Sequence, residues 1–201
     1  MNGLLSGTMS EGIYRKAGSS TNIQKLMTAL RKDAFSVQIT RGEFNEHDVS
    51  STLKRFLREM PEPIMGKHAV SFLSVSEMRS SSDKIEAYRE LLHRLPIVEF
   101  QTMKKILGHL HFIQAQRDIN KMRAENLAMV FGPTLMQPNS GSNDNQYQID
   151  SRECDVVAEL ITNYKKLYDL SEDEIVSWIK FFCMFTGLKK NCEPLGIHDQ
   201  S

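Results

Sequence analysis

The chain has 201 residues, 40% of them hydrophobic, and its 25 Lys and Arg residues balance its 25 Asp and Glu residues. That length and apolar content suit one folded domain and exclude a disordered tail, which needs lower hydrophobicity and a larger net charge. The zero net charge argues against a dedicated nucleic-acid binder, which normally carries a basic excess. Nucleic acid is therefore not an expected partner.

The cysteines and the hydropathy pattern indicate in which cellular compartment the chain is expected. Three cysteines without a CxxC pair, at 154, 183 and 192, disfavour a disulfide framework or a zinc site and favour a reducing compartment. No run of 18 apolar residues occurs, and the N-terminus lacks the basic region of a signal peptide. We expect a cytoplasmic chain without direct membrane insertion, recruited to membranes only through domains absent from it.

Helical periodicity dominates the first half of the chain. Apolar residues recur every three or four positions over 23–30, after hydroxyl side chains that can cap a helix. A second helix is predicted from Asp48 and is stopped by Pro61 and Pro63, because proline lacks the N–H that a helix needs. A shorter helix is predicted over 67–73. The buried face of the second helix is predicted to comprise Val49, Leu53, Phe56, Leu57 and Met60.

The second half continues the helical pattern. Helices are predicted between a cap at 80–83 and Pro96, over 98–116, over 123–131, from Ser151 through Tyr168, and from a capping box at 171–174 onward. Gly132 and Pro133 are expected to end the 123–131 helix. Residues 116–121 are predicted as a polar turn and 137–150 as a surface loop. The pattern predicts an all-α, single-domain fold.

Signatures of a self-contained enzyme are missing. The sequence contains no HExxH, EF-hand or GxSxG pattern, and two histidines at 109 and 111 point to different faces of a helix. Gly7 and Gly12 have P-loop spacing, but Ile13 stands where the phosphate-binding lysine is required. We therefore expect no metal site and no bound cofactor.

Two short segments differ from ordinary helix or loop composition. In Glu-Gly-Ile-Tyr-Arg-Lys-Ala-Gly, residues 11–18, two glycines bracket a bulky pair and two cations just before a helix start. By itself, Arg15 in such a loop is most simply a solvated surface residue. In the 53–63 segment, Lys54 and Arg58 are four residues apart and share a face beside the apolar stripe. That pair is either a solvated helix edge or a cation site for an anionic partner.

The third unusual segment is Asn-Lys-Met-Arg-Ala-Glu-Asn-Leu-Ala-Met-Val-Phe-Gly-Pro, residues 120–133. Asn126 lies within an otherwise apolar helix, where an unpaired amide is costly. Its side chain either makes a local hydrogen bond or reaches a partner, and the spacing alone favours the local bond.

Together and in this order, the three segments resemble the arginine-finger loop, the proline-ended helix and the asparagine-containing segment of the Rho GTPase-activating (RhoGAP) domain. The resemblance covers about residues 10–170. Within the family, the sequence looks most similar to multidomain proteins that combine Arf-GAP, Rho-GAP, ankyrin-repeat and PH domains. It implies a RhoGAP-type helical bundle over 10–170, a short lead over 1–9, and a C-terminal helix and tail over 171–201.

The resemblance implies a catalytic role for one residue. Arg15 matches the finger arginine, which enters the active site of a GTP-loaded partner and neutralises charge on the transferring phosphoryl group. The partner implied is a Rho- or Rac-type small GTPase, which carries the GTP and Mg²⁺, so this chain needs no cofactor of its own.

The other matched residues imply partner contacts. Lys54 and Arg58 match positions that contact the GTPase switch region and steady the finger loop. Asn126 matches the asparagine that hydrogen-bonds the partner's switch, and Asn120 and Lys121 are expected to stabilise the same GTPase-binding surface.

The alternative is a RhoGAP-like module that binds Rho-family GTPases or other signalling partners without accelerating hydrolysis. Family members carry a helix before the finger loop, whereas only ten residues precede Glu11 here. We expect that helix to be missing, which favours the alternative, whereas retention of the matched polar residues favours an activator.

Charge is unevenly distributed along the chain. Residues 15–58 contain nine cations and four anions, residues 104–123 five cations and one anion, and residues 153–180 three cations and seven anions. The two basic stretches contain residues matched to GTPase contact. The sequence therefore predicts a localised basic docking site for an acidic partner.

Overall fold

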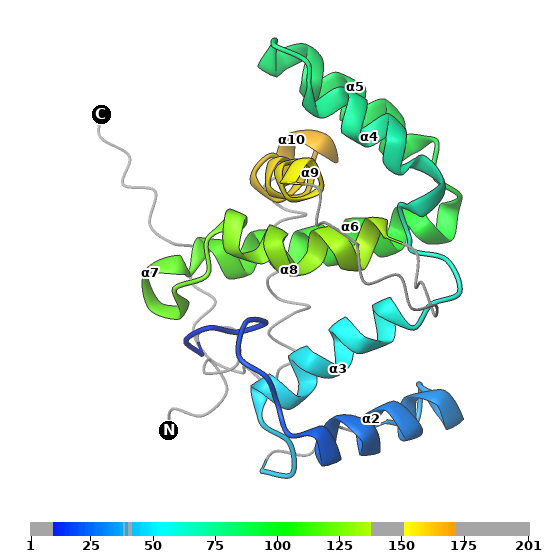
Figure 1. Cartoon of the computed structure of the whole chain (residues 1–201), viewed down its shortest axis with the longest axis vertical. Helices are drawn as coiled ribbons and strands as arrows, with labels where there is room; N and C mark the ends of the chain where they lie inside the picture. The colour runs from blue at the N-terminus through cyan, green and yellow to red at the C-terminus, as the bar shows by residue number, and fades with distance from the viewer. Residues whose placement is uncertain (1–9, 38, 40–41, 138–150, 172–201) are drawn as a thin grey trace.

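The structure is a computed structural model that describes residues 10–37, 39, 42–137 and 151–171. Its regular elements are all helical, which confirms the all-α fold class (Figure 1). No helix within the described ranges has the length and hydropathy needed to cross a membrane. The elements are α2 (Ser20–Asp33), α3 (Glu46–Arg58), η1 (Gly66–His68), α4 (Ala69–Ser76), α5 (Ser81–His93), α6 (Ile97–Ala115), α7 (Arg117–Asn120), α8 (Ala124–Met136), α9 (Ser151–Thr162) and α10 (Tyr164–Leu167).

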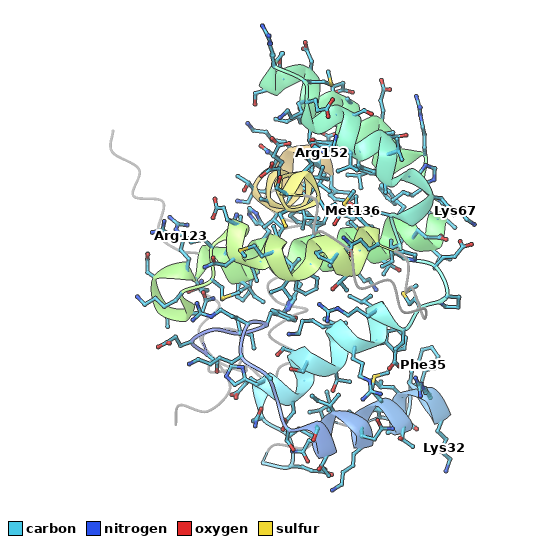
Figure 2. All side chains as sticks on the ribbon, viewed as in Figure 1. Lys32, Phe35, Lys67, Arg123, Met136 and Arg152 are labelled. Carbon is cyan, nitrogen blue, oxygen red and sulfur yellow. The ribbon has the colours of Figure 1, made fainter. Side chains whose placement is uncertain are left out.

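The helices are arranged around α6 and α8. Figure 1 shows α9 and α10 on one side of this pair with α4 and α5 beyond them, and α3 followed by α2 on the other side. The segment 10–18, which we call the Arg15 loop, runs past α7 and α3 to the start of α2. In Figure 2, Lys32 and the fully exposed Phe35 lie at the far end of α2, whereas Arg123 lies at the opposite edge of the molecule.

The core forms where α6, α8 and α9 meet. Apolar side chains that are completely buried there include Met103, Leu107, Leu110, Ile113, Leu127, Phe131, Leu135, Val157 and Leu160. Each such side chain contributes about 1.5–3 kcal/mol through removal of its surface from water. Gly132 lets α8 approach α9 closely, because a Cβ there would lie 3.3 Å from the Glu153 carbonyl oxygen. The rigid α6–α8 pair is the base on which the Arg15 loop rests.

The predicted end of one helix was wrong. α8 continues through Gly132 and Pro133 to Met136. Proline in a helix removes one backbone donor, the one that would reach the carbonyl of Met129. The cost is offset by packing, since Leu135 and Met136 are buried in the core beyond the proline.

Other boundaries also differ from the sequence prediction. Residues 117–120 of the predicted polar turn form α7, and the predicted 151–168 helix is interrupted at Asn163 between α9 and α10. Phe56 is 45% exposed instead of buried, because the inward face of α3 is centred on Leu57. The helix predicted from 171–174 onward and residues 138–150 of the predicted loop lie outside the described residues.

A buried tyrosine connects α5 to α9. The hydroxyl of Tyr88 donates to Glu159 Oε2 at 2.8 Å, and Lys84 forms an ion pair with Glu159 Oε1 at 2.7 Å. Burial, and then the neighbouring Glu159 carboxylate, raise the pKa of Tyr88, so this hydroxyl remains protonated.

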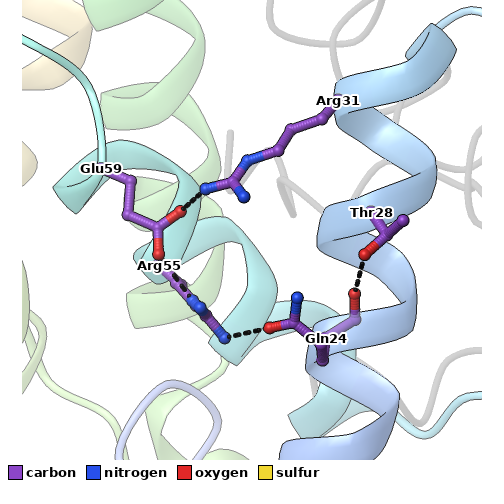
Figure 3. A network of polar contacts seen from close by, with 5 residues as sticks. All are labelled: Gln24, Thr28, Arg31, Arg55 and Glu59. Carbon is purple, nitrogen blue, oxygen red and sulfur yellow. Dashed lines mark hydrogen bonds and ion pairs between the residues drawn. The ribbon is translucent and has the colours of Figure 1, made fainter.

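A polar network holds α2 against α3 (Figure 3). Arg55 Nε donates to Glu59 Oε1 at 2.8 Å and Arg55 Nη1 to Gln24 Oε1 at 3.0 Å, while Arg31 of α2 pairs with the other Glu59 oxygen. The hydrogen bond from Arg55 is the main cause of a lowered pKa at Glu59. The network lies at the surface and fixes the relative orientation of the two helices more than it stabilises the fold.

The start of α3 is tied to the segment that leaves the Arg15 loop. Asn45 caps α3 by accepting the amide of Asp48 at 2.8 Å, so the helix begins two residues before the predicted Asp48. The buried Asp48 carboxylate accepts the Ser19 amide at 2.7 Å and the Asn22 side chain at 2.8 Å. Burial alone raises the pKa of Asp48, but these hydrogen bonds and the Asn45 amide outweigh it and hold the pKa below its usual value.

Gly18 permits this close junction. A Cβ at Gly18 would lie 2.6 Å from both the Cα of Asp48 and the carbonyl oxygen of His47, so no larger residue fits without movement of the backbone. The Gly18 amide also donates to Ser51 Oγ at 3.1 Å. The exit of the Arg15 loop is therefore fixed on α3.

We predict that Asp48→Asn lowers the free energy of unfolding by about 2–3 kcal/mol at pH 7, because an amide group would face donors that need an acceptor. The lowered pKa means that the stabilisation by Asp48 is complete above its unfolded value of about 3.9 and is lost as the pH falls through its folded value. Urea unfolding at pH 7 and at about pH 3 should therefore show the difference between the two proteins shrinking in acid. Asp118→Asn, which replaces an exposed carboxylate, serves as the control. An equal loss of stability in this variant would contradict the prediction.

Candidate functional site: the Arg15 loop

The Arg15 loop folds as two tight turns. The Ile13 amide donates to the Ser10 carbonyl at 3.1 Å, and the Arg15 and Lys16 amides both donate to the Gly12 carbonyl at 2.8 Å. Gly12 has φ +72°, which glycine adopts without strain. The glycine that the sequence places before the bulky pair is thus required by the turn.

Burial divides the loop into an inner and an outer part. Ile13 and Tyr14 are 4% and 3% exposed, whereas the next two residues, Arg15 and Lys16, are exposed. Tyr14 has φ +68°, an uncommon conformation for a large side chain, so its surroundings must stabilise it. The loop turns an apolar pair inward and a cationic pair outward.

The Tyr14 side chain ends against α6 and α8. Its ring packs edge-on against Phe131, with centroids 4.9 Å apart at 71°, and its hydroxyl lies 2.5 Å from His109 Nε2. Burial raises the pKa of Tyr14 and lowers the pKa of His109 to about 4. Both groups are consequently neutral near pH 7 and form a neutral hydrogen bond.

The two cations predicted on α3 point to different neighbours. Lys54 Nζ donates to the Tyr14 carbonyl at 2.5 Å, and Arg58 Nε donates to Thr134 Oγ1 of α8 at 3.1 Å. Burial, and then the nearby Arg58 charge, lower the pKa of Lys54. Lys54 therefore holds the carbonyl directly before Arg15, while Arg58 remains exposed beside it.

Asn120 lies beneath the loop and not at the surface. It is completely buried; its Nδ2 donates to the Ile113 carbonyl and its Oδ1 accepts the Met122 amide, both at 2.8 Å. Its backbone carbonyl accepts the Gly12 amide at 2.8 Å. Asn120 therefore links α6, the segment before α8 and the Arg15 loop, and it can stabilise the expected GTPase-binding surface only from beneath.

Lys121 and Asn126 form the turn into α8. Lys121 is exposed, has φ +60°, and donates from Nζ to the Asp118 carbonyl at 2.6 Å. Asn126 Nδ2 donates to the Lys121 carbonyl at 3.2 Å. The local hydrogen bond considered for Asn126 is thus present, and the half-buried side chain still reaches the surface beside the loop.

The structure therefore gathers all six expected residues around one loop, five of them at or near the surface. Within the described residues, no hydrogen bond or ion pair is recorded for the side chain of Arg15. The neighbouring Lys16, by contrast, pairs with Glu11 at 3.4 Å. A guanidinium held out by a fixed backbone is suited to an incoming anion, because its planar fork is permanently charged. The same described part of the chain contains no group of three side chains that could hold a metal ion.

Sequence reasoning missed several groups that fix the loop. His109 was considered only as one of two histidines on different faces of a helix, and Tyr14 only as part of a bulky pair. Their contact spans 95 positions, so no local pattern could indicate it. Asp48 was seen only as a helix start; its place three residues after a cap-forming asparagine was the available signal.

Comparisons with known proteins show the family to which this chain is similar. The family model described as RhoGAP domain matches residues 4–140. The human Arf-GAP with Rho-GAP domain, ANK repeat and PH domain-containing protein 3 is 31% identical over 170 residues, which are 84% of this chain and 10% of that protein. Human GEM-interacting protein is 31% identical over 181 residues, covering 81% of this chain and 18% of that protein. The chain thus spans a small part of the length of these relatives.

Solved structures are similar as well. The BH domain from GRAF, the GTPase regulator associated with focal adhesion kinase, superposes with a TM-score of 0.72 at 28% identity, covering 83% of this chain and 88% of that chain. Human Rho GTPase activating protein 15 gives a TM-score of 0.71 at 28% identity, covering 81% and 77%. With its helical fold, its sequence and the match over residues 4–140, this chain belongs to the RhoGAP domain family.

Proposed function

We propose that this chain stimulates GTP hydrolysis by a Rho- or Rac-type small GTPase and that Arg15 is the catalytic group it supplies. The observation that supports this most is the contrast between Arg15 and its loop. The side chain is exposed without a recorded partner among the described residues, while the backbone on both sides is fixed by Gly12, Tyr14 and Gly18. Such an arrangement suits delivery of a charge to another molecule.

The chemistry asked of Arg15 is electrostatic. When the γ-phosphoryl group of GTP is transferred to water, negative charge spreads over its oxygens, and an arginine placed against them lowers the barrier. The effect is greatest when the charge is already oriented, since no reorganisation is then needed during the reaction. The partner holds GTP and Mg²⁺, and this chain requires no cofactor.

The neighbouring residues have two kinds of role in this proposal. Lys54 and Asn120 position the loop, through the Tyr14 carbonyl and the Gly12 amide respectively. Arg58, Lys121 and Asn126 are placed around it to contact the switch region of the GTPase.

The charge pattern supports the same surface. Cations from the loop, α3 and the turn before α8 come together, and the N-terminus of α8 adds its positive dipole end. The acidic α9 packs against α8 and α4, on the other side of the α6–α8 pair (Figure 1). An acidic partner would be attracted to the Arg15 side of the molecule.

We predict that Arg15→Ala lowers the stimulated rate of hydrolysis by about a thousandfold. The measurement is single-turnover GTP hydrolysis by a panel of Rho-family GTPases at saturating amounts of this chain. Lys16→Ala is the matched control, because it removes the adjacent cation of the same loop, and it should retain most of the stimulation.

The proposal fails if the wild-type chain and Arg15→Ala are equally unable to accelerate any GTPase of the panel. Binding to a GTPase without acceleration would then support a binding module. An equal loss in Lys16→Ala would indicate that general charge, and not a finger, is responsible.

We further predict that Asn126→Ala weakens binding to a GTPase loaded with a non-hydrolysable GTP analogue by about tenfold, since its amide is expected to bond the partner. Titration calorimetry would measure the change. Asn163→Ala is the control, because Asn163 makes a similar bond to a backbone carbonyl, that of Glu159 at 3.0 Å, between α9 and α10. Unchanged affinity in Asn126→Ala would leave that residue with a purely local role.

A further inference from the structure

We propose that the hydrogen bond between Tyr14 and His109 is a positioning contact for Arg15: it fixes the turn of the loop so that the adjacent guanidinium is held in its working direction. The inference rests on the proposed finger role of Arg15 and assigns Tyr14 and His109 as positioning residues. Tyr14 is buried and His109 is half-buried, whereas Arg15 is exposed.

The first support is conformational. Tyr14 is held at φ +68°, a region that large side chains avoid because it strains the backbone. Without compensating contacts the residue would return to a negative φ. That change would rotate the peptide that joins it to Arg15 and redirect the following side chain.

The second support is that Tyr14 is held at both ends. Its carbonyl accepts Lys54 Nζ at 2.5 Å, and its hydroxyl reaches His109 Nε2 at 2.5 Å. Between these ends, the ring packs edge-on against Phe131. Lys54 fixes only the backbone of Tyr14, whereas the bond to His109 fixes the far end of its side chain.

The third support is the rigidity of the anchor. His109 lies in α6 between Leu107 and Leu110, and both of these leucines are completely buried. A helix held this way cannot move without disturbing the core. Because the imidazole is neutral, the bond makes a directional contact without placing a charge beneath Arg15.

The test uses Tyr14→Phe, which keeps the ring and its packing but removes the hydroxyl. With a GTPase that the wild-type chain accelerates, we expect the maximal stimulated rate to fall about five- to tenfold. Affinity for the same GTPase loaded with a GTP analogue should change less than about twofold, because Arg15 acts mainly in the transition state. Affinity for the same GTPase with bound GDP–aluminium fluoride should fall together with the stimulated rate.

A matched control separates positioning from general stability. Tyr88→Phe also removes a buried tyrosine hydroxyl, the one bonded to Glu159, but far from the loop. It should lower the stability to a similar extent and leave the stimulated rate unchanged. On the other side of the contact, His109→Gln should retain more stimulation than His109→Leu, since only the amide can bond to the Tyr14 hydroxyl. Adding Tyr14→Phe to His109→Leu should then lower the stimulated rate little further.

Three results would overturn the inference: a wild-type rate in Tyr14→Phe, a parallel loss of rate and ground-state affinity, or the same rate defect in Tyr88→Phe. These are distinct from failure of the proposed function, in which Arg15→Ala itself would have no effect. If Arg15→Ala strongly lowers the stimulated rate and Tyr14→Phe does not, the proposed role of Arg15 stands and the positioning role of Tyr14 is wrong.

Discussion

The role proposed for Arg15 requires an exposed side chain on a backbone that is as well fixed as that of a core residue. The Arg15 loop meets this requirement through Tyr14, whose carbonyl, ring and hydroxyl contact α3, α8 and α6 respectively. The Gly12 amide and the Gly18 junction fix the two ends. The three contacts of Tyr14 come from three different helices, so the loop depends on how these helices are arranged around it.

Most of the fold followed from the periodicity of apolar residues. Long helices such as α2 and α6 were predicted to within a few residues, because apolar residues recur along them at helical spacing. The errors lie where tertiary packing overrides a local rule. Pro133 is accommodated since Leu135 and Met136 gain burial, and Phe56 is exposed because Leu57 takes the inward position.

The site was predictable only in part. The segments containing Arg15, Lys54 and Asn126 could be recognised as motifs, and the structure places them together. Asn120 was expected to stabilise the GTPase-binding surface, but no short pattern indicated that its side chain is buried beneath the loop and bonded to two backbone groups. Contacts such as Tyr14 with His109 depend on how α6 is rotated in the core, which no short pattern records.

The sequence separation of these contacts has a consequence for folding. The bond from Lys54 to Tyr14 spans 40 positions and that from His109 spans 95, so the loop cannot acquire its shape before α3 and α6 have docked. Closing such long stretches of chain is slow and entropically costly. The proposed GTPase-stimulating activity should accordingly be among the last properties gained during refolding. A substitution anywhere in the α3, α6 and α8 interfaces that promotes partial opening would then lower activity before it causes global unfolding.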